Sequence, residues 1–205
     1  DAFTPRPTRF CAIARTGSFF SMSTDISSNR AARKWTRSEN MRRAIWTLVS
    51  PLFRFSPRIF WGWRRVLLRL FGAKVGPRAH IYPTVRITIP WNLEIGEEAA
   101  VGDYAILYAL GPISIGARAT VSQYAHLCAG SHDWRDPQMP LIKTPLSVGA
   151  DAWVCASAFV GPGVSVGVGA ILGAAAVTMK DVEAHTIVGG NPAQVIRKRI
   201  EDEKQ

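Results

Sequence analysis

Residues 148–177 read VGADAW, VCASAF, VGPGVS, VGVGAI and LGAAAV, which are five consecutive units of six residues. Each unit opens with a branched aliphatic residue and has a small residue in second place. These units open at Val148, Val154, Val160, Val166 and Leu172. Earlier units with the same pattern open at Ile95, Val101, Ile115, Val121 and Leu127, and a weaker copy starts at Val75 and runs through Ile81 and Ile87. An internal repeat therefore runs through residues 75–180.

A period of six fits neither a helix, which needs 3.6, nor a two-faced strand, which needs 2. Three six-residue faces make one coil of a triangular prism, about 18 residues per turn. The branched residue of each face points inward and stacks on its equivalent in the next coil, and the small residue sits at a corner where a Cβ would be crowded. The repeat predicts an all-β fold, a parallel β-helix.

The repeat is interrupted after His132. The fifteen residues 133–147, DWRDPQMPLIKTPLS, contain three prolines and do not fit a coil. We expect them to form an excursion loop that leaves the prism. Loops carried by a rigid scaffold are a common location of catalytic chemistry, so this loop is the first place to look for a site.

Residues 41–74 are basic and rich in tryptophan, with Pro51 and Pro57 as helix breakers. This pattern predicts two or three short amphipathic helices. One hypothesis is that their apolar faces cap the open end of the prism, as a solenoid requires. The other is that they contact a membrane surface. Both can hold for the same segment.

The two ends of the chain are expected to differ from the prism. Residues 1–40 are predicted to be a poorly ordered extension. Residues 1–21 lack the apolar core of a signal peptide, and Met22 or Met41 is expected to be the natural start. Residues 181–205 leave the repeat and are predicted to form a tail and a short helix packed along the prism.

The net charge of +10 belongs to the N-terminal third of the 205 residues. Residues 1–74 hold 15 Lys and Arg against 3 acids, whereas residues 75–205 hold 10 against 12. The basic charge therefore indicates anionic lipid near the N-terminal segment and not a nucleic-acid surface on the prism. Cys11, Cys128 and Cys155 show no paired spacing, which is typical of a reducing compartment. We expect a cytoplasmic protein that can lie at the inner face of the membrane.

Four segments carry a family resemblance: FRFSPRIFWGWRRVLLRLFGAKVG, PTVRITIPWNLEIG, GSHDWRDP and VGGNPAQVIRKR. With them, the chain resembles hexapeptide-repeat acyltransferases of the galactoside, maltose and nodulation acetyltransferase group, and most closely the colanic acid biosynthesis acetyltransferases. The resemblance spans about Ser38 to Arg199. It implies a left-handed β-helix, a homotrimer with sites between subunits, and acetyl transfer from acetyl-CoA to a sugar hydroxyl in exopolysaccharide biosynthesis, with no metal.

His132 is the main catalytic candidate, because it stands at the start of the loop and matches the family's catalytic histidine. Acetyl transfer needs a general base for the acceptor hydroxyl, and imidazole titrates near neutrality. Asp133 is predicted to orient the imidazole, a task that Asp103 or a backbone carbonyl could also perform. The thioester is already activated, so Cys128 and Cys155 are interpreted as small residues of their repeats.

The resemblance also assigns the cosubstrate and acceptor contacts. It implies backbone contacts to the pantetheine arm near Ala156 and Ala174, an oxyanion donor near Ala156 just after Trp153, and phosphate contacts from Lys180 and Arg197. The predicted acceptor residues are Asp103, Tyr104, Tyr108, Trp134 and Arg135.

The chain departs from the family pattern in two places. Residues 173–175 are Gly-Ala-Ala where many relatives have Gly-Ala-Gly, and Met179 stands where they have threonine. Ala109 and Leu110 follow Tyr108 where galactoside-type enzymes have an asparagine that helps to bind the sugar. The first departure affects the cofactor mapping, and the second leaves the acceptor sugar open.

Two other classes of function fit a prism of this kind. One is a zinc-dependent carbonic anhydrase-like prism with His80, His126 and His132 as ligands from two subunits. His126 and His132 are one repeat apart, which separates them by about a strand length and is poor geometry for one metal. The other is a non-catalytic scaffold subunit. For a transferase, the basic N-terminal segment favours a lipid-linked acceptor over a free sugar.

Overall fold

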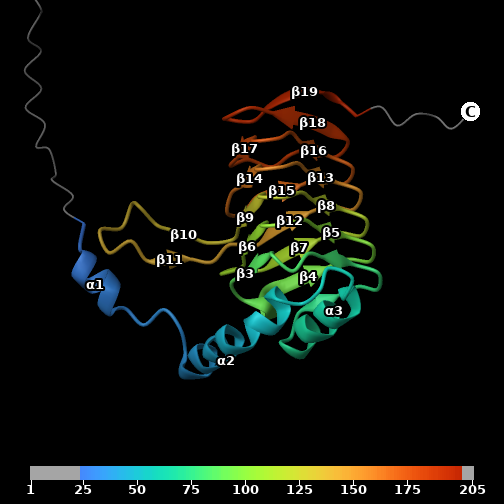
Figure 1. The fold of residues 1–205 in the computed structure, drawn as a ribbon. Helices are drawn as coiled ribbons and strands as arrows, with labels where there is room; N and C mark the ends of the chain where they lie inside the picture. The colour runs from blue at the N-terminus through green and yellow to red at the C-terminus, as the bar shows by residue number, and fades with distance from the viewer. Residues whose placement is uncertain (1–23, 200–205) are drawn as a thin grey trace, which may run out of the picture.

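The structure is a computed structural model that describes residues 24–199. Its body is the predicted left-handed parallel β-helix, with coils stacked into a prism of three faces (Figure 1). Face A contains β1 (Lys74–Val75), β4 (Leu93–Ile95), β7 (Ile113–Ile115), β12 (Leu146–Val148) and β15 (Ser165–Val166). Face B contains β2 (His80–Ile81), β5 (Ala100–Val101), β8 (Thr120–Val121), β13 (Trp153–Val154), β16 (Ile171–Leu172), β18 (Thr186–Gly189) and β19 (Gln194–Lys198). Face C contains β3 (Arg86–Ile87), β6 (Ile106–Tyr108), β9 (His126–Cys128), β14 (Phe159–Val160) and β17 (Val177–Thr178).

The opening residues of the units form the core in the predicted register. On face A, Val75 pairs with Ile95, Ile95 with Ile115, Ile115 with Val148, and Val148 with Val166. All five are buried, and the last four are only 1% exposed. The stack places one aliphatic side chain above another along the whole prism, which removes apolar surface from water at every coil.

The coils differ in length, and the surplus residues all lie at one corner. Between partners on face A, 18 residues separate Val148 from Val166, but 20 separate Ile95 from Ile115 and 33 separate Ile115 from Val148. Six residues always lead from face A to face B and from face B to face C. Every insertion therefore falls at the corner between faces C and A, where the 3-10 helix η1 (Pro90–Asn92) and the predicted excursion also lie.

Glycine in second place is needed because successive coils approach closely. A Cβ on Gly116 would lie 2.4 Å from the backbone nitrogen of Ala150 in the next coil. At this corner the residues with a left-handed backbone conformation are not these glycines but Arg118 (φ 57°) and Asp151 (φ 58°). The N–H of Arg118 donates to the carbonyl of Glu97 at 2.8 Å, so a coil-to-coil hydrogen bond offsets the strain. Close approach, and not a positive φ, selects this glycine.

Helices α2 (Arg37–Arg54) and α3 (Trp61–Leu70) cover the N-terminal end of the prism (Figure 1). Trp46, Phe53 and Leu68 on their inner faces belong to the same buried core as the coils. The Trp46 indole N–H donates to the carbonyl of Ile87 at 3.0 Å. These helices therefore cap the prism, as one of the two hypotheses for this segment expected. None of the described helices is long and apolar enough to cross a bilayer.

The C-terminal end is closed by a strand, and the prediction of a short helix there is wrong. Strand β19 pairs antiparallel with β18, the last strand of face B. The edge of a β-helix offers a row of unpaired N–H and C=O groups, and a returning strand satisfies them where a helix cannot. Residues 200–205, the end of that predicted helix, lie outside the described residues.

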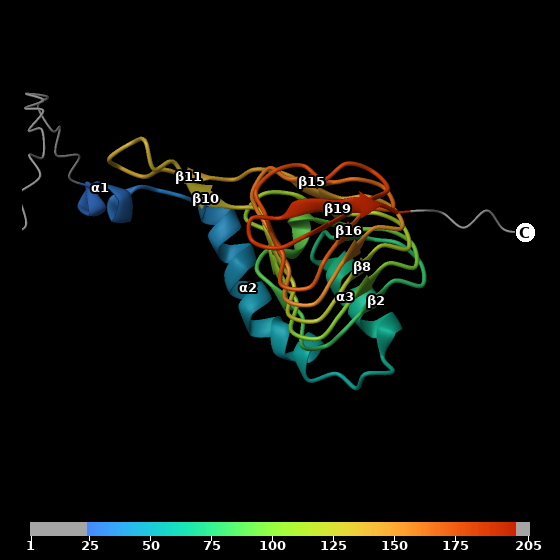
Figure 2. The same cartoon turned by 90° about the horizontal axis from the view of Figure 1, so that it is seen from above.

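Residues 24–40, for which we expected little order, contain a short helix and the start of another. Helix α1 (Ile26–Ala31) lies beside a hairpin that projects from the prism, and α2 begins at Arg37 (Figures 1 and 2). Thr36 and Glu39 form a capping box at the start of α2. The rest of the predicted extension, residues 1–23, lies outside the described residues, and so does the candidate start Met22.

We expect Gly116→Ala to destabilise the protein by about 2 kcal/mol or more, because the new Cβ would overlap backbone that cannot move aside. Gly62→Ala is the matched control, since only the far end of Arg65 lies near its Cβ, at 3.9 Å. That change lies in a helix and should be neutral or slightly stabilising. Denaturant unfolding of the full chain measures both. Equal midpoints for the two variants would contradict the close-approach argument.

Candidate active site

His132 lies on a hairpin that projects from the corner between faces C and A (Figures 1 and 2). Strand β10 (Ser131–His132) pairs antiparallel with β11 (Leu141–Ile142). The predicted excursion is thus a short hairpin, and it ends sooner than expected, because residues 146 and 147 already belong to β12 on face A. The hairpin holds the imidazole away from the flat faces of the prism.

The hydrogen bond of His132 defines its tautomer. Its Nδ1 lies 2.6 Å from the backbone carbonyl oxygen of Met139. A carbonyl can only accept, so Nδ1 carries the proton and donates it, and in the neutral ring Nε2 holds the lone pair. The side chain is half-buried. In the neutral ring, Nε2 is therefore the nitrogen that can accept a proton.

The carboxylate of Asp133, predicted to orient the imidazole, is hydrogen-bonded to Arg135 instead. Its Oδ1 accepts from Nε of Arg135 at 3.0 Å and from the Arg135 backbone N–H at 3.1 Å. These hydrogen bonds lower the pKa of the Asp133 carboxyl. The backbone carbonyl of Met139 takes the orienting position, which was the open alternative. Trp134 is exposed at the tip of the same hairpin.

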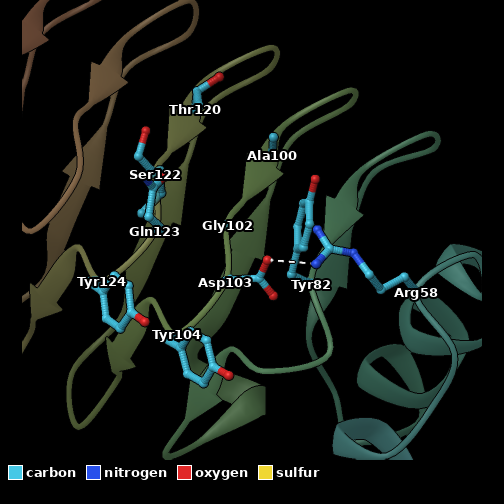
Figure 3. A pocket seen from close by; sticks show the side chains of 11 residues that line it. Arg58, Tyr82, Ala100, Gly102, Asp103, Tyr104, Thr120, Ser122, Gln123 and Tyr124 are labelled. Carbon is cyan, nitrogen blue, oxygen red and sulfur yellow. Dashed lines mark ion pairs between the residues drawn. The ribbon is translucent and has the colours of Figure 1, made fainter.

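A pocket of about 480 Å³ lies at the corner between faces B and C (Figure 3). The carboxylate of Asp103 is among the groups that line it. The carboxylate accepts from the hydroxyl of Thr84 at 2.7 Å and pairs with Arg58 at 3.1 Å. The ring of Tyr104 stacks on that of Tyr124, with centroids 5.1 Å apart. The pocket thus combines a carboxylate with an aromatic wall.

Of the residues that line this pocket, sequence reasoning identified only Asp103 and Tyr104, and Tyr124 and Arg58 are the most informative that it missed. Tyr124 occupies the fourth place of its unit, as Tyr104 does of the unit one coil earlier, so the repeat could have revealed the pair. Arg58 comes from the turn between α2 and α3, and its guanidinium also lies over the ring of Tyr82. No sequence signal connects that turn to the pocket, because only the docking of the helical cap brings it there.

The predicted pantetheine contacts continue this corner along the prism. Ala156 and Ala174 have small side chains, and within residues 24–199 no acceptor takes their backbone N–H groups. Trp153 is half-exposed on face B, and its indole N–H donates to the hydroxyl of Ser122 at 2.8 Å. Open donors beside small side chains suit a thin, amide-bearing chain such as pantetheine. The residues present therefore fit this part of CoA.

The predicted phosphate contacts lie further away. Lys180 is exposed at the corner between faces C and A, and Arg197 is exposed on β19. In the described part of the chain, no carboxylate forms an ion pair with either cation.

Within one chain, His132 and the pocket lie at different corners. His132, Trp134 and Arg135 are at the corner between faces C and A, whereas Asp103 and Tyr104 are at the corner between faces B and C. Tyr108 lies between them on face C, where its ring contacts His126.

The three histidines of the zinc hypothesis lie in separate surroundings. The ring of His80 lies against Trp61 with centroids 4.7 Å apart, and His126 is packed edge-on to Phe159. Burial lowers the pKa of His126. Among residues 24–199, no group of three or more His, Cys, Asp or Glu is placed to hold a metal ion.

The chain is 44% identical over 158 residues to the "Putative colanic acid biosynthesis acetyltransferase WcaF" of Escherichia coli (strain K12), covering 77% of this chain and 87% of that protein. A stretch of 57 residues is 49% identical to a chloramphenicol acetyltransferase of Escherichia coli, 27% of whose length it covers. No family model matches the chain. The chain belongs to the hexapeptide-repeat acetyltransferase family.

Solved structures share this fold at low sequence identity. A galactoside acetyltransferase in complex with coenzyme A superposes with a TM-score of 0.76 at 20% identity, covering 87% of this chain and 92% of that one. A maltose O-acetyltransferase from Clostridium difficile 630 has a TM-score of 0.75 at 21% identity, covering 88% and 100%. These likenesses show that the left-handed prism fold is common to all three chains.

We expect Asp133→Asn to reduce acetyl transfer by less than about threefold, because an exposed ion pair with Arg135 contributes little and the imidazole is oriented by a carbonyl. The turnover number with acetyl-CoA and a panel of sugar acceptors measures this. A loss of a hundredfold or more would show that the Asp133 carboxylate acts on His132 after all.

Proposed function

We propose that this acetyltransferase moves an acetyl group from acetyl-CoA to a sugar hydroxyl in exopolysaccharide biosynthesis, with His132 as the general base. The observation that carries the proposal is the hydrogen bond from His132 Nδ1 to the Met139 carbonyl, which leaves Nε2 as the basic atom. The name of the WcaF relative and those of the galactoside and maltose enzymes support a carbohydrate acceptor.

The reaction needs one proton transfer in each direction. Nε2 of His132 takes the proton of the acceptor hydroxyl while that oxygen attacks the thioester carbonyl. The backbone N–H near Ala156 stabilises the negative charge on the carbonyl oxygen. The C–S bond then breaks, and the imidazolium returns its proton to the departing sulfur of CoA. The products are the acetyl ester and CoA, and the histidine is neutral again.

The pocket around Asp103 is the proposed acceptor site. A carboxylate accepts hydrogen bonds from sugar hydroxyls, and stacked rings such as Tyr104 and Tyr124 offer an apolar face to the C–H groups of a sugar ring. Arg58 and Thr84 hold the carboxylate in place. We propose that Tyr108, Trp134 and Arg135 contact the acceptor from the side of the hairpin.

We propose that the active form is a homotrimer in which the hairpin of one chain faces the pocket of the next. The separation of His132 from Asp103 within one chain supports this arrangement. The outer side of face C also supports it, because its strands present apolar or aromatic side chains outward. These are Ile106, Tyr108, Phe159 and Val177.

We expect His132→Ala to lower the turnover number by about 10²- to 10⁴-fold while CoA binding persists, because only the proton acceptor is removed. His80→Ala is the matched control and should keep most of the activity, since His80 only packs on Trp61. Initial rates of CoA release and calorimetric binding of CoA measure the two effects. Full activity after His132→Ala would overturn the base assignment.

The same proteins distinguish the two other classes of function. One zinc per site in purified protein, lost together with activity in His80→Ala, would favour the carbonic anhydrase-like prism. No measurable CoA binding by the unmodified protein would favour the scaffold subunit. Acetyl transfer with retained activity in His80→Ala contradicts both.

We also propose that the outer surface of the helical cap contacts the cytoplasmic face of a membrane that contains anionic lipid. Leu48, Leu52 and Phe55 are spaced by four and three residues along α2 and lie on one helix face, away from the prism core. Leu48 is 79% exposed and Phe55 is 83% exposed. A groove lined by Leu52, Phe55, Phe60 and Trp63 continues this surface.

The charge around this apolar surface selects a bilayer as its occupant. The described residues 24–74 hold 12 Lys and Arg against 2 acids, and anionic lipids attract such an excess. Arg58 lines the pocket and Phe60 lines the apolar groove, and both lie in the same turn. A lipid-linked acceptor held at the membrane would therefore lie beside the pocket. The cap therefore meets the pocket on one side and the lipid surface on the other.

We expect the double change Phe55→Ser with Ile59→Ser to weaken binding to anionic vesicles by about tenfold or more, because two exposed apolar side chains can no longer enter the bilayer. Val195→Ser with Ile196→Ser is the matched control at the other end of the prism, where both side chains are also exposed. Sedimentation with vesicles with and without anionic lipid measures the binding. Equal binding by both variants would remove the proposal, and self-association through the same residues would appear instead as a change in sedimentation velocity.

A further inference from the structure

The Met139 carbonyl that holds His132 accepts a second hydrogen bond. The side-chain Nδ2 of Asn29 donates to it at 2.7 Å, and His132 Nδ1 donates to it at 2.6 Å. Asn29 belongs to α1, 110 residues before Met139 in the chain. One carbonyl oxygen therefore joins an N-terminal helix to the proposed general base.

The amide of Asn29 is held in the orientation that this contact requires. Its Oδ1 accepts from the ammonium group of Lys34 at 2.9 Å. Its Nδ2 donates to the carbonyls of Gln138, at 2.6 Å, and Met139. A flipped amide would aim an oxygen at two carbonyls and a nitrogen at an ammonium group, so only one orientation satisfies all three partners.

Further contacts tie the same segment to the hairpin. We call residues 25–35 the strap. The backbone N–H of Asp25 donates to the carbonyl of Pro137 at 2.8 Å. Lys143, just after β11, places its ammonium 3.6 Å from the ring centre of Trp35 and donates to the carbonyl of Lys34. The strap thus contacts the loop between β10 and β11 and the residue that follows β11.

The hairpin needs such support. Its ladder consists of only two residue pairs, Ser131 with Ile142 and His132 with Leu141, and a two-stranded hairpin is marginal in water. Met139 also has a φ of 45°, a left-handed conformation that costs free energy in a residue other than glycine. A second donor on the Met139 carbonyl offsets that cost and fixes the direction of the oxygen.

We infer that Asn29 is a positioning residue for acetyl transfer, which keeps His132 in the tautomer with a basic Nε2. The inference rests on the proposed function of His132. Without the Asn29 donor, the Met139 carbonyl is free to turn away, and His132 can then move its proton to Nε2. A histidine protonated at Nε2 cannot take the proton of the acceptor hydroxyl, so the base is lost although the residue remains.

Asn29→Asp tests this inference, because it keeps the shape of the side chain and removes its N–H donors. We expect the turnover number to fall about tenfold or more with the KM for acetyl-CoA unchanged. Asn29→Ala, which removes the donors without adding a repelling charge, should give a smaller loss. Asn40→Asp is the matched control, an exposed asparagine in α2 that should retain full activity.

The imidazole nitrogen shifts of His132 give a readout that does not depend on activity. In protein labelled with ¹⁵N-histidine, we expect one tautomer for unmodified protein and for Asn40→Asp, and a mixture for Asn29→Asp. His132→Ala identifies the signal. An unchanged His132 spectrum in Asn29→Asp would overturn the inference, whether or not activity falls. A changed spectrum with full activity would instead contradict the role of His132 as base.

Discussion

The structure depends on the close stacking of coils, in which backbone hydrogen bonds run along the prism while aliphatic side chains stack inside it. This stacking requires backbone to lie directly on backbone at the corners, which is why Gly116 has no room for a Cβ. The same stacking puts residues from successive coils into columns on the surface. Tyr104 and Tyr124 form such a column, and so do Ala156 and Ala174. A binding surface thus follows from the geometry of the core.

Regular stacking also determines where irregularity is tolerated. Two corners of the prism are kept at constant length, and every inserted residue is placed at the third. The hairpin with His132 extends from that corner, whereas the pocket of Asp103 lies at the corner on the other side of face C. A long excursion is tolerated because the coils before and after it still pair, as Ile115 does with Val148. The proposed base thus lies on an appendage, and the stacking of the scaffold is undisturbed.

The appendages explain which parts of the site could be predicted. The excursion and His132 could be predicted because they break a strict period. Tyr124 could have been predicted from its place in the repeat. Arg58 and Asn29 were not, because each reaches its partner through the docking of a helix from outside the repeat. Asp133 was assigned to the imidazole because it is adjacent in sequence, but its carboxylate turns to Arg135 and a carbonyl seven residues from His132 takes its place. The terminal strand β19 was missed for a related reason, since its partner is an edge that exists only once the prism is complete.

The sequence by itself determined the prism, its register and its buried residues. In a repeat of six, the place of a residue within its unit decides whether its side chain points into the core. It also determined where the period fails, and with that the location of the candidate base. The tertiary structure alone decided which atom of His132 is basic, which groups surround Asp103, and how α1 meets the hairpin. Those contacts join residues as far apart as Asn29 and Met139, and they depend on the direction of single carbonyl and amide groups, which no periodic pattern encodes.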